Sequence, residues 1–535
     1  MAGVFRKRVA LLYSCWDCTD QHPIDVEPTM LKTQMIQFTT CSSNPFADDL
    51  INAHLLTRDN QVIQGTVSIE NGIITANTQG HANFSLCLLY DAGKAGRLML
   101  QTAILPQREE PYLLSLELAR HRIKMFLDQC ENWSLFGLSD ENPAVEAWEQ
   151  SRLIFTKALV CKDEHKQGEL ARKSLELSII ASERLTMAHA QILLHKRYAH
   201  KSASSSTLGV TISSKRFDEP LRKLVHKNTD IITIPMPWTE IEPEEGKYEW
   251  GAIDRWVKWA RNHKKHIIAG PLIDFTTENE IPQWVKDKEH DYSKFRDKCY
   301  DHLERVIQRY GVAVSFWNVV SGINLNRHVR LSLGNMVDLI RTARLLVKQA
   351  RKDARVMVEL SEPFSEFVAN TPESSNAKVF LSRLSQEGVS LDALGVQLLV
   401  GGSGGRTTRD LMLISTKLDE FLLADFPVII SALGAPSKTI SLQNGWWREP
   451  WDEKRQDLWA KQMLWITLSK PFVDAVIWTD LYDYKTMALP TAGYISLRGK
   501  PRQVLHRVLA MKKLLQKPLG PLVLPKRNDV DTQSG

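Results

Sequence analysis

The chain has 535 residues, of which 68 are basic and 62 acidic, so its formal net charge is +6 with the histidines neutral. At roughly 150 residues per domain this length allows two to four domains and a large core. The basic residues form no dominant block and no apolar stretch reaches membrane-spanning length, which argues against nucleic acid and membrane as partners.

The first 34 residues show no sustained periodicity and predict a disordered extension, as do residues 518–535. Cys15 and Cys18 form a C-x-x-C pair, but no second pair or histidine cluster follows, which favours an extension over a metal or redox site. Seven cysteines, an odd number, argue against a disulfide framework. The short apolar run near the start lacks a small-residue cleavage site, so a cytoplasmic protein without metal or cofactor is expected.

Residues 35–107 carry β-type patterns. Strand-like runs occur at residues 61–69, 72–76, 84–90 and 97–105. Asn71 and Gly72 form the dipeptide that is typical of a tight hairpin between two of these runs. The pattern predicts a small antiparallel β domain.

Residues 108–205 predict a helical connector. One apolar pattern begins near Leu113, Pro143 opens a second helix, and a third, long helix is expected over about 167–197. So long a helix must pack on a neighbour, by default the barrel or the β domain. The serine-rich segment 202–207 has the composition of a flexible linker.

The rest of the chain alternates strand-like and helical patterns. Strands are predicted at residues 208–212, 231–235, 266–271, 315–320, 355–360, 393–398, 427–432 and 475–479. Helices are predicted at residues 219–227, 253–262, 297–310, 336–351, 409–422, 454–468 and 501–515. Eight such units predict a (β/α)8 TIM barrel over residues 206–517, whose site is expected at the carboxyl ends of the strands.

Several strings in this barrel resemble family 10 glycoside hydrolases, the endo-β-1,4-xylanase family. The most specific are WTEIEPEEGKYEW at 238–250 and WNVV at 317–320. The order is continued by PQW at 282–284, YG at 310–311, GVQ at 395–397 and PVII at 427–430. The resemblance covers about residues 206–517 and implies a xylanase-like barrel of polysaccharide metabolism.

The same resemblance implies a retaining mechanism, in which one carboxylic acid donates a proton and a second carboxylate attacks the sugar. The family's donor motif W-D-V-V-N-E reads WNVVSG here, with Gly322 at the donor position. The nucleophile motif T-E-L-D reads SALG, with Ala432 at the nucleophile position. Supporting positions differ as well, since E-N-x-x-K reads TIPMP at 233–237 and a family histidine is Leu399. Neither glycine nor alanine can transfer a proton or form a glycosyl ester, which predicts a degenerate, pseudoenzyme member.

Other carboxylates could replace the missing pair. Asp274 follows the third strand and Glu359 ends the fifth, and these two are the preferred relocated acid and base. Glu362, Asp480 and Asp483 lie at the same face. The alternative for all five is rim charge or salt bridging.

Aromatic and amide residues at strand ends are the candidate sugar contacts. They are Trp238, Trp317, Asn318, Asn324, Gln397 and Trp478. For the three tryptophans core packing is the favoured role, although each could line a groove. Trp446, Trp447 and Trp451 either stack on sugar or pin their loop to the barrel, and the glycine-rich loop 401–406 reads as a lid rather than a phosphate site.

Three functions remain open from the sequence. The first is a degenerate barrel that binds an oligo- or polysaccharide or serves structurally, and the second is an active hydrolase of β-1,4-linked polysaccharide with relocated carboxylates. The third is a protein-interaction scaffold in which the N-terminal regions carry the function. No protein partner is identified by the sequence.

Overall fold

The computed structural model describes residues 33–40 and 50–520, except for 136–137, 140, 205–206, 372, 425 and 486. Cys15, Cys18 and nearly all of the predicted N-terminal extension lie outside the described residues, as does the tail from residue 521 onwards.

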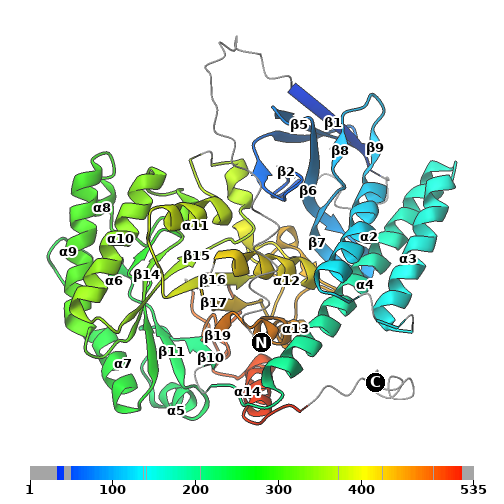
Figure 1. Ribbon diagram of the computed structural model, residues 1–535. Helices are drawn as coiled ribbons and strands as arrows, with labels where there is room; N and C mark the ends of the chain where they lie inside the picture. The colour runs from blue at the N-terminus through cyan, green and yellow to red at the C-terminus, as the bar shows by residue number, and fades with distance from the viewer. Residues whose placement is uncertain are drawn as a thin grey trace.

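The C-terminal part is a closed parallel barrel, on the left in Figure 1. Its strands are β10 (Leu208–Thr211), β11 (Ile231–Ile234), β12 (His266–Ala269), β14 (Phe316–Ser321), β15 (Arg355–Leu360), β16 (Ala393–Leu399), β17 (Val428–Gly434) and β19 (Val473–Trp478). Pairing of β12 with β14 closes the ring, and the short β13 (Ile273–Asp274) extends it. The predicted (β/α)8 barrel is therefore confirmed.

Helices surround this barrel. They are α5 (Glu219–Asn228), α6 (Trp238–Ile241), α7 (Gly251–Asn262), α8 (Gln283–Lys286), α9 (Tyr292–Tyr310), α10 (Leu333–Ala350), α11 (Ala377–Gln386), α12 (Leu411–Glu420), α13 (Glu453–Ser469) and α14 (Gln503–Leu515). Several begin at an Asp, Asn or Ser whose side chain accepts a hydrogen bond from the first turn, as Asp410 does for α12 and Ser332 for α10. Helix α11 is absent from the predicted helices.

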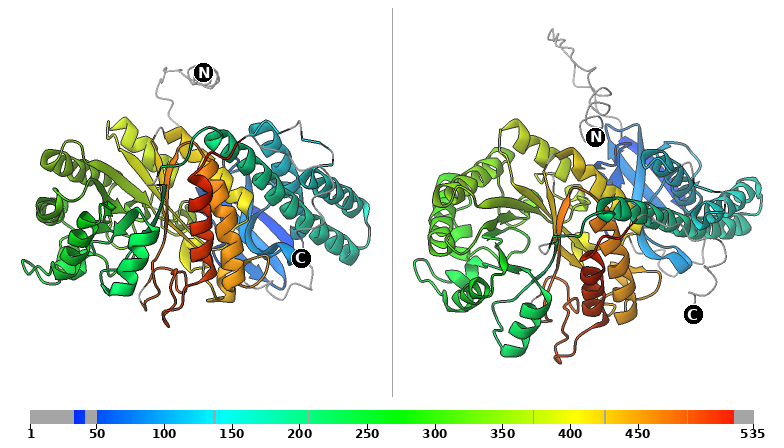
Figure 2. Two further views of the ribbon diagram at one scale, coloured as in Figure 1. Left: turned by 90° about the horizontal axis from the view of Figure 1, so that it is seen from below. Right: turned by 60° about the horizontal axis from the view of Figure 1, so that its bottom comes forward.

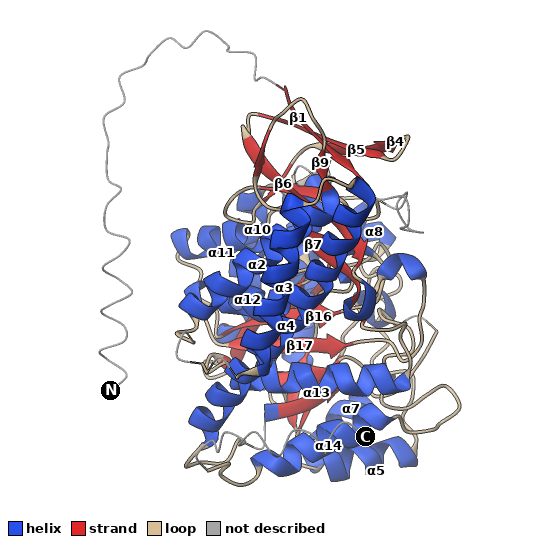
Figure 3. Cartoon of the chain, turned by 90° about the vertical axis from the view of Figure 1, so that its right-hand side faces the viewer, coloured by secondary structure: helices blue, strands red, loops and turns tan. Residues whose placement is uncertain are grey.

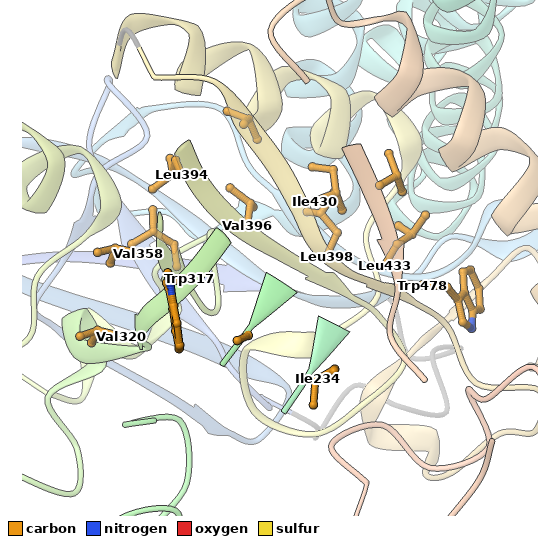
Figure 4. Close-up of a cluster of buried hydrophobic side chains, with 14 of the residues drawn as sticks. Ile234, Trp317, Val320, Val358, Leu394, Val396, Leu398, Ile430, Leu433 and Trp478 are labelled. Carbon is orange, nitrogen blue, oxygen red and sulfur yellow. The ribbon is translucent and has the colours of Figure 1, made fainter. Parts of the chain in front are cut away.

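The barrel strands separate two apolar cores. One cluster takes a residue or two from each of seven strands and fills the barrel interior: Ile231, Ile268, Phe316, Met357, Ala393, Ile429, Ala475 and Ile477. The neighbouring residues of the same strands pack outwards against the helices, and Figure 4 shows Trp317, Val358 and Trp478 among them. Because strand side chains alternate, this frame fixes which residues can reach the top of the barrel interior.

The N-terminal region contains two sheets whose strands pair antiparallel, apart from the parallel pair of β1 with β9. One has the order β4-β5-β1-β9 and the other β18-β7-β6-β2-β3, with β8 paired to β6. Their strands are β1 (Thr33–Thr39), β2 (His54–Leu56), β3 (Val62–Ile63), β4 (Thr66–Glu70), β5 (Ile73–Gln79), β6 (Asn83–Asp91), β7 (Gly96–Gln101), β8 (Leu105–Pro106), β9 (Tyr112–Leu113) and β18 (Trp446–Trp447). Asn71 and Gly72 both have positive φ in the β4–β5 hairpin, as a type I′ turn requires. The predicted small β domain is thus present, and it contains two sheets.

Three helices connect these sheets to the barrel: α2 (Leu114–Asn132), α3 (Pro143–Val160) and α4 (Glu164–Tyr198). Figure 2 shows α4 running from the other two helices to the barrel, where it contacts α12 and α13. Near its end, the Arg197 guanidinium donates to the backbone oxygens of Leu468, Lys470 and Val473 at 2.6 to 2.9 Å. The segment expected to be a flexible linker is also tied at Ala203, whose N–H donates to Leu515 O at 2.8 Å.

A short strand from a barrel loop joins the N-terminal sheet. The pair Trp446–Trp447 (β18) follows β17 in the chain and pairs antiparallel with Gly96 and Arg97 of β7. Figure 3 shows the other N-terminal sheet, with β1, β4 and β5, at the end of the molecule opposite the barrel helices α5 and α14. The β7 sheet is therefore the one that connects the N-terminal region to the barrel.

Candidate functional site

A pocket of about 470 Å³ lies at the carboxyl ends of the barrel strands. Its lining includes five carboxylates, Glu240, Asp274, Glu280, Glu359 and Asp480, and two cations, Lys215 and Arg406. This is the face where barrel enzymes carry their sites, and the volume lies within the range of small-ligand pockets.

The pocket floor continues the inner face of the strands. Asn318 follows Phe316 on β14, and Glu359 follows Met357 on β15, each two residues beyond a member of the interior core. Gln397, near the end of β16, and Thr479, just beyond β19, also lie at inward positions. The register shift between β16 and β17 brings two neighbours of β17, Ser431 and Ala432, to the pocket together.

Glu359 and Asn318 form the central contact of the floor. The Asn318 amide donates to Glu359 Oε2 at 3.1 Å, and both residues are buried. Asn318 Oδ1 and Ser431 Oγ are buried and have no partner among the described residues. An unsatisfied buried polar atom costs about 1 to 3 kcal/mol, so these two atoms favour a hydrogen-bonding ligand or water.

Asp274 stands on β13 beside this floor. Burial, together with the nearby negative charges of Glu280 and Glu359, raises the pKa of Asp274 to about 7. The carboxylate accepts a hydrogen bond from Thr276 N at 2.8 Å, which opposes the rise. A carboxyl group with this pKa is about half protonated at neutral pH and can donate a proton.

Asp480 is a second carboxyl of the same kind on the other side. Burial raises its pKa to about 7, although hydrogen bonds from Thr479 and Tyr484 favour the charged form. Thr479 Oγ1 lies 3.0 Å from Asp480 Oδ2.

The two other candidate carboxylates serve ion pairs outside the pocket lining. Glu362 binds Arg327, with the closest atoms 2.6 Å apart, and Asp483 binds Arg502 at 2.5 Å. Neither residue lines the pocket. The rim-charge alternative therefore fits Glu362 and Asp483.

Arg406 brings a positive charge into the pocket from the glycine-rich loop. This loop contains a 3-10 turn at Gly404–Arg406, and Arg406 Nη1 donates to Ala488 O at 2.8 Å. Burial lowers the pKa of Arg406, while the carboxylates of Glu362 and Asp274 oppose this change. The loop is thus held in place and presents a cation to Asp274.

Sequence reasoning did not name Arg406, Lys215, Glu240, Glu280 or Tyr484 as pocket residues. All five lie in loops or in the short helix α6, where no strand periodicity exists to point them inwards. The available signal was their position just after a predicted strand.

Seven of the candidate site residues named from the sequence line the pocket together: Trp238, Asp274, Asn318, Glu359, Gln397, Ala432 and Asp480. The buried Trp238 indole stacks on His302 with centroids 4.2 Å apart, and its Nε1 donates to Glu242 at 3.0 Å. Trp238 therefore forms a fixed wall of the pocket. Gln397 Oε1 accepts a hydrogen bond from Ser361 Oγ at 3.0 Å.

Four further candidates at or near the strand ends lie outside the pocket lining. Trp317 and Trp478 are displaced by one residue from the inward positions and pack in the outer core. Asn324 is buried and donates to Ser375 O at 3.4 Å. Gly322 has a φ of 65°, and a Cβ there would stand 2.7 Å from Thr276 Cγ2.

The tryptophans of the loop after β17 serve the contact between the N-terminal region and the barrel. Trp447 is fully buried, and its Nε1 donates to Glu183 Oε1 of helix α4 at 2.6 Å. Trp451 Nε1 donates to Gly445 O within the loop at 3.2 Å. Neither these two nor Trp446 lines the pocket. Of the two roles considered for these tryptophans, holding their loop in place therefore fits better than stacking on sugar.

In the part of the chain that the structure describes, no group of three or more His, Cys, Asp or Glu side chains could hold a metal ion. Within the same residues, every helix is too short or too polar to cross a membrane.

Comparison with known proteins points to one family. Residues 196–434 match the model described as Glycosyl hydrolase family 10. Endo-1,4-beta-xylanase A of Xylanibacter ruminicola is 28% identical over 204 residues, which are 36% of this chain and 53% of that protein. Endo-1,4-beta-xylanase 3 of Hypocrea jecorina is 25% identical over 32% of this chain and 49% of its own length. The chain thus spans about half the length of the curated relatives that it matches.

The chain is also similar in part to solved structures. Xylanase 10B from Thermotoga petrophila RKU-1, in complex with xylobiose, matches 60% of this chain and 96% of that chain at 17% identity, with a TM-score of 0.44.

Proposed function

We propose that this protein, whose barrel belongs to Glycosyl hydrolase family 10, binds oligosaccharides of a β-1,4-linked polysaccharide without hydrolysing them by a retaining mechanism. The observation that carries the proposal is the alanine at position 432, which lines the pocket where the resemblance expects the nucleophile. Gly322 stands at the expected donor position and lies outside the lining. A methyl group and a hydrogen atom can neither attack a sugar nor protonate its leaving oxygen.

Polar groups of the pocket floor support sugar binding. Asn318 Oδ1 and Ser431 Oγ lack partners among the described residues, and a sugar hydroxyl can donate to the first and donate to or accept from the second. The carboxylate of Glu359 is already oriented by Asn318 Nδ2 at 3.1 Å. Such fixed acceptors are the groups that select hydroxyl-rich ligands.

Calorimetric titration with xylo- and cello-oligosaccharides, with product analysis of the same samples, tests the proposal. We expect binding without new products. Asn318→Ala should weaken binding at least fivefold, because it removes one unsatisfied acceptor and the donor to Glu359. Asn324→Ala is the matched control, since Asn324 is also buried but lies outside the pocket lining. Equal loss in both variants would mean that the pocket is not the site.

A second function, hydrolysis by relocated carboxylates, is favoured by Asp274 and Glu359. Both line the pocket, and the pKa of Asp274 is raised to about 7 by burial, which suits a general acid. Their strands β13 and β15 flank β14, where Ser321 pairs with both residues. Two strand spacings separate their Cα atoms by roughly 10 Å. Carboxyl groups that keep a separation close to this value would form an inverting pair.

This second function predicts turnover with inversion at the anomeric carbon. Asp274→Asn and Glu359→Gln should then each abolish product formation while oligosaccharide still binds, and proton NMR of the first product would give its configuration. Turnover by the unchanged protein would refute the binding-only proposal. If the protein neither bound nor cleaved the oligosaccharides, the result would favour the scaffold alternative and direct attention to residues 35–205.

A further inference from the structure

The barrel pocket carries more negative than positive charge. Its lining holds five carboxyl groups and two cations, Lys215 and Arg406. The Lys215 ammonium lies 3.4 Å from Glu240 and forms an ion pair with it. Arg406 faces Asp274, whose negative charge opposes the lowering of the arginine pKa by burial. Even when both cations are assigned to these partners, three carboxyl groups of the lining remain without a cation.

These three are the carboxyl groups of Glu280, Glu359 and Asp480. Glu359 accepts a hydrogen bond from the Asn318 amide, and Asp480 from the Thr479 hydroxyl, so both of these partners are neutral. Among the residues that the structure describes, no ion pair links any of the three to a lysine, an arginine or a histidine. Buried negative charge without a counter-charge costs free energy, so the pocket favours bound protons or a bound cation.

The pKa values of the pocket reflect the same imbalance. Burial, with the charges of Glu280 and Glu359, raises the pKa of Asp274 to about 7. Burial raises the pKa of Asp480 to about 7 as well, and burial with the charge of Glu240 raises that of Glu280. A cation bound among these groups would lower their pKa values, and its binding would therefore release protons.

Two unsatisfied atoms show that the ligand of this pocket also carries hydroxyl groups. Asn318 Oδ1 and Ser431 Oγ have no partner among the described residues, and both side chains are more than nine-tenths buried in the pocket lining. A hydroxyl group can donate to each of them. A metal ion is a poorer fit, because the described His, Cys, Asp and Glu side chains form no group that could hold one.

We infer that the pocket selects a β-1,4-linked oligosaccharide of an amino sugar, whose ammonium group lies against Glu280 and Glu359 and whose hydroxyl groups bind Asn318 and Ser431. This inference rests on the proposed function and names the class of sugar. An ammonium group only donates hydrogen bonds, and carboxylates only accept them. A neutral oligosaccharide would leave the three carboxyl groups without a counter-charge, and a sugar acid would be repelled.

The surface of the whole protein does not favour a cationic ligand. The chain has a formal net charge of +6, so its overall field repels a cation weakly. A preference for an amino sugar must therefore come from the pocket itself, which makes the comparison of charged and neutral sugars a specific test.

Three trisaccharides with the same β-1,4 linkage test the role of charge by calorimetric titration of the full chain at pH 6.5. The glucosamine trimer has an ammonium group where cellotriose has a hydroxyl group and the N-acetylglucosamine trimer a neutral acetamide. We expect the glucosamine trimer to bind at least tenfold more tightly than either neutral sugar. Titrations in buffers with different heats of ionisation should show that it releases protons on binding, whereas cellotriose releases none.

The variant Glu280→Gln removes one of the three charges and nearly keeps the size of the side chain. The ratio of the affinities for the glucosamine trimer and cellotriose should fall to about threefold or less. Glu278→Gln is the matched control, because Glu278 lies in the same loop between β13 and α8 but is exposed and outside the pocket lining. This control should keep the ratio at tenfold or more.

The outcomes separate this inference from the proposed function. Equal affinity for the glucosamine trimer and cellotriose would overturn the inference and leave oligosaccharide binding intact. An equal fall of the ratio in Glu280→Gln and Glu278→Gln would also overturn it, as would tighter binding of the acetylated trimer. If none of the three trisaccharides and no xylo-oligosaccharide bound, the proposed function itself would be wrong, and the inference would fail with it.

Discussion

The two sides of the barrel rim are held by different parts of the chain. On the side of β16 and β17, Asn52 of the N-terminal region donates to Gly404 O at 3.0 Å and lies 2.6 Å from Thr407 Oγ1, and β18 pairs with β7. On the side of β11 and β12, the described contacts of Trp238 and Asp274 are made within the barrel. The N-terminal region therefore supports one half of the pocket, the half that carries Arg406.

The largest effect is expected at the strongest of these connections. Trp447→Ala removes a fully buried indole and the donor to Glu183, and should lower the free energy of unfolding by about 3 to 5 kcal/mol. Denaturant unfolding measures this loss. Trp284→Ala is the matched change on the other side, where the indole is only partly buried against Trp238. If both variants lost the same stability, the two sides would not differ.

The pH dependence of stability concerns the carboxyls that face each other across the pocket. Burial raises the pKa of Asp274 and of Asp480 to about 7, well above that of an unfolded aspartate. The folded state therefore keeps protons that the unfolded state has released, so the contribution of these two groups to stability is highest below about pH 4 and falls up to about pH 7. Because water reaches the pocket, we expect a loss of about 1 to 2 kcal/mol for each residue.

Unfolding curves at pH 4, 5.5 and 7 measure this loss. Asp274→Asn should reduce the slope of the free energy of unfolding against pH. Asp274→Asn with Asp480→Asn should remove most of this slope, because asparagine does not titrate. A slope that both variants leave unchanged would contradict the assignment. Asp287→Asn on the barrel surface is the control, and it should leave the slope as it is.

A smaller effect is expected where the N-terminal region holds the glycine-rich loop. Asn52 has a φ of 54°, so Asn52→Gly removes the amide without straining the backbone. Two hydrogen bonds are lost, which should cost about 1 kcal/mol of stability and weaken oligosaccharide binding several-fold through Arg406. Asn71→Gly, at a φ of 52° in the β4–β5 hairpin, is the matched control. Unchanged oligosaccharide affinity in Asn52→Gly would show that the contact of Asn52 with the glycine-rich loop does not affect binding in the pocket.

The barrel could be predicted from the sequence because its strands are buried on both faces and read as continuous apolar runs. Asn318 and Glu359 were found because they are polar residues within such runs, and both occupy inward positions. For Trp317 the sequence favoured core packing but left a groove contact open, since an apolar run does not reveal which of two alternating faces is the inner one. Pairing of Trp446 and Trp447 with β7 joins segments about 350 residues apart, and no local pattern reports such a contact.

The smallest effect on stability is expected at Lys215, on the side of the rim that the barrel itself holds. The Lys215 side chain is about half exposed, with its ammonium 3.4 Å from Glu240 Oε1, so Lys215→Gln should change the free energy of unfolding by less than about 0.5 kcal/mol. Lys215 nevertheless lines the pocket beside Tyr484, with its ammonium 5.7 Å from the ring centroid. Oligosaccharide affinity should therefore fall about two- to fivefold, because a charged donor to sugar hydroxyls is replaced by a shorter, neutral amide. Calorimetry and unfolding of this one variant separate binding from stability, and a large loss of stability would show that this side also depends on a single contact.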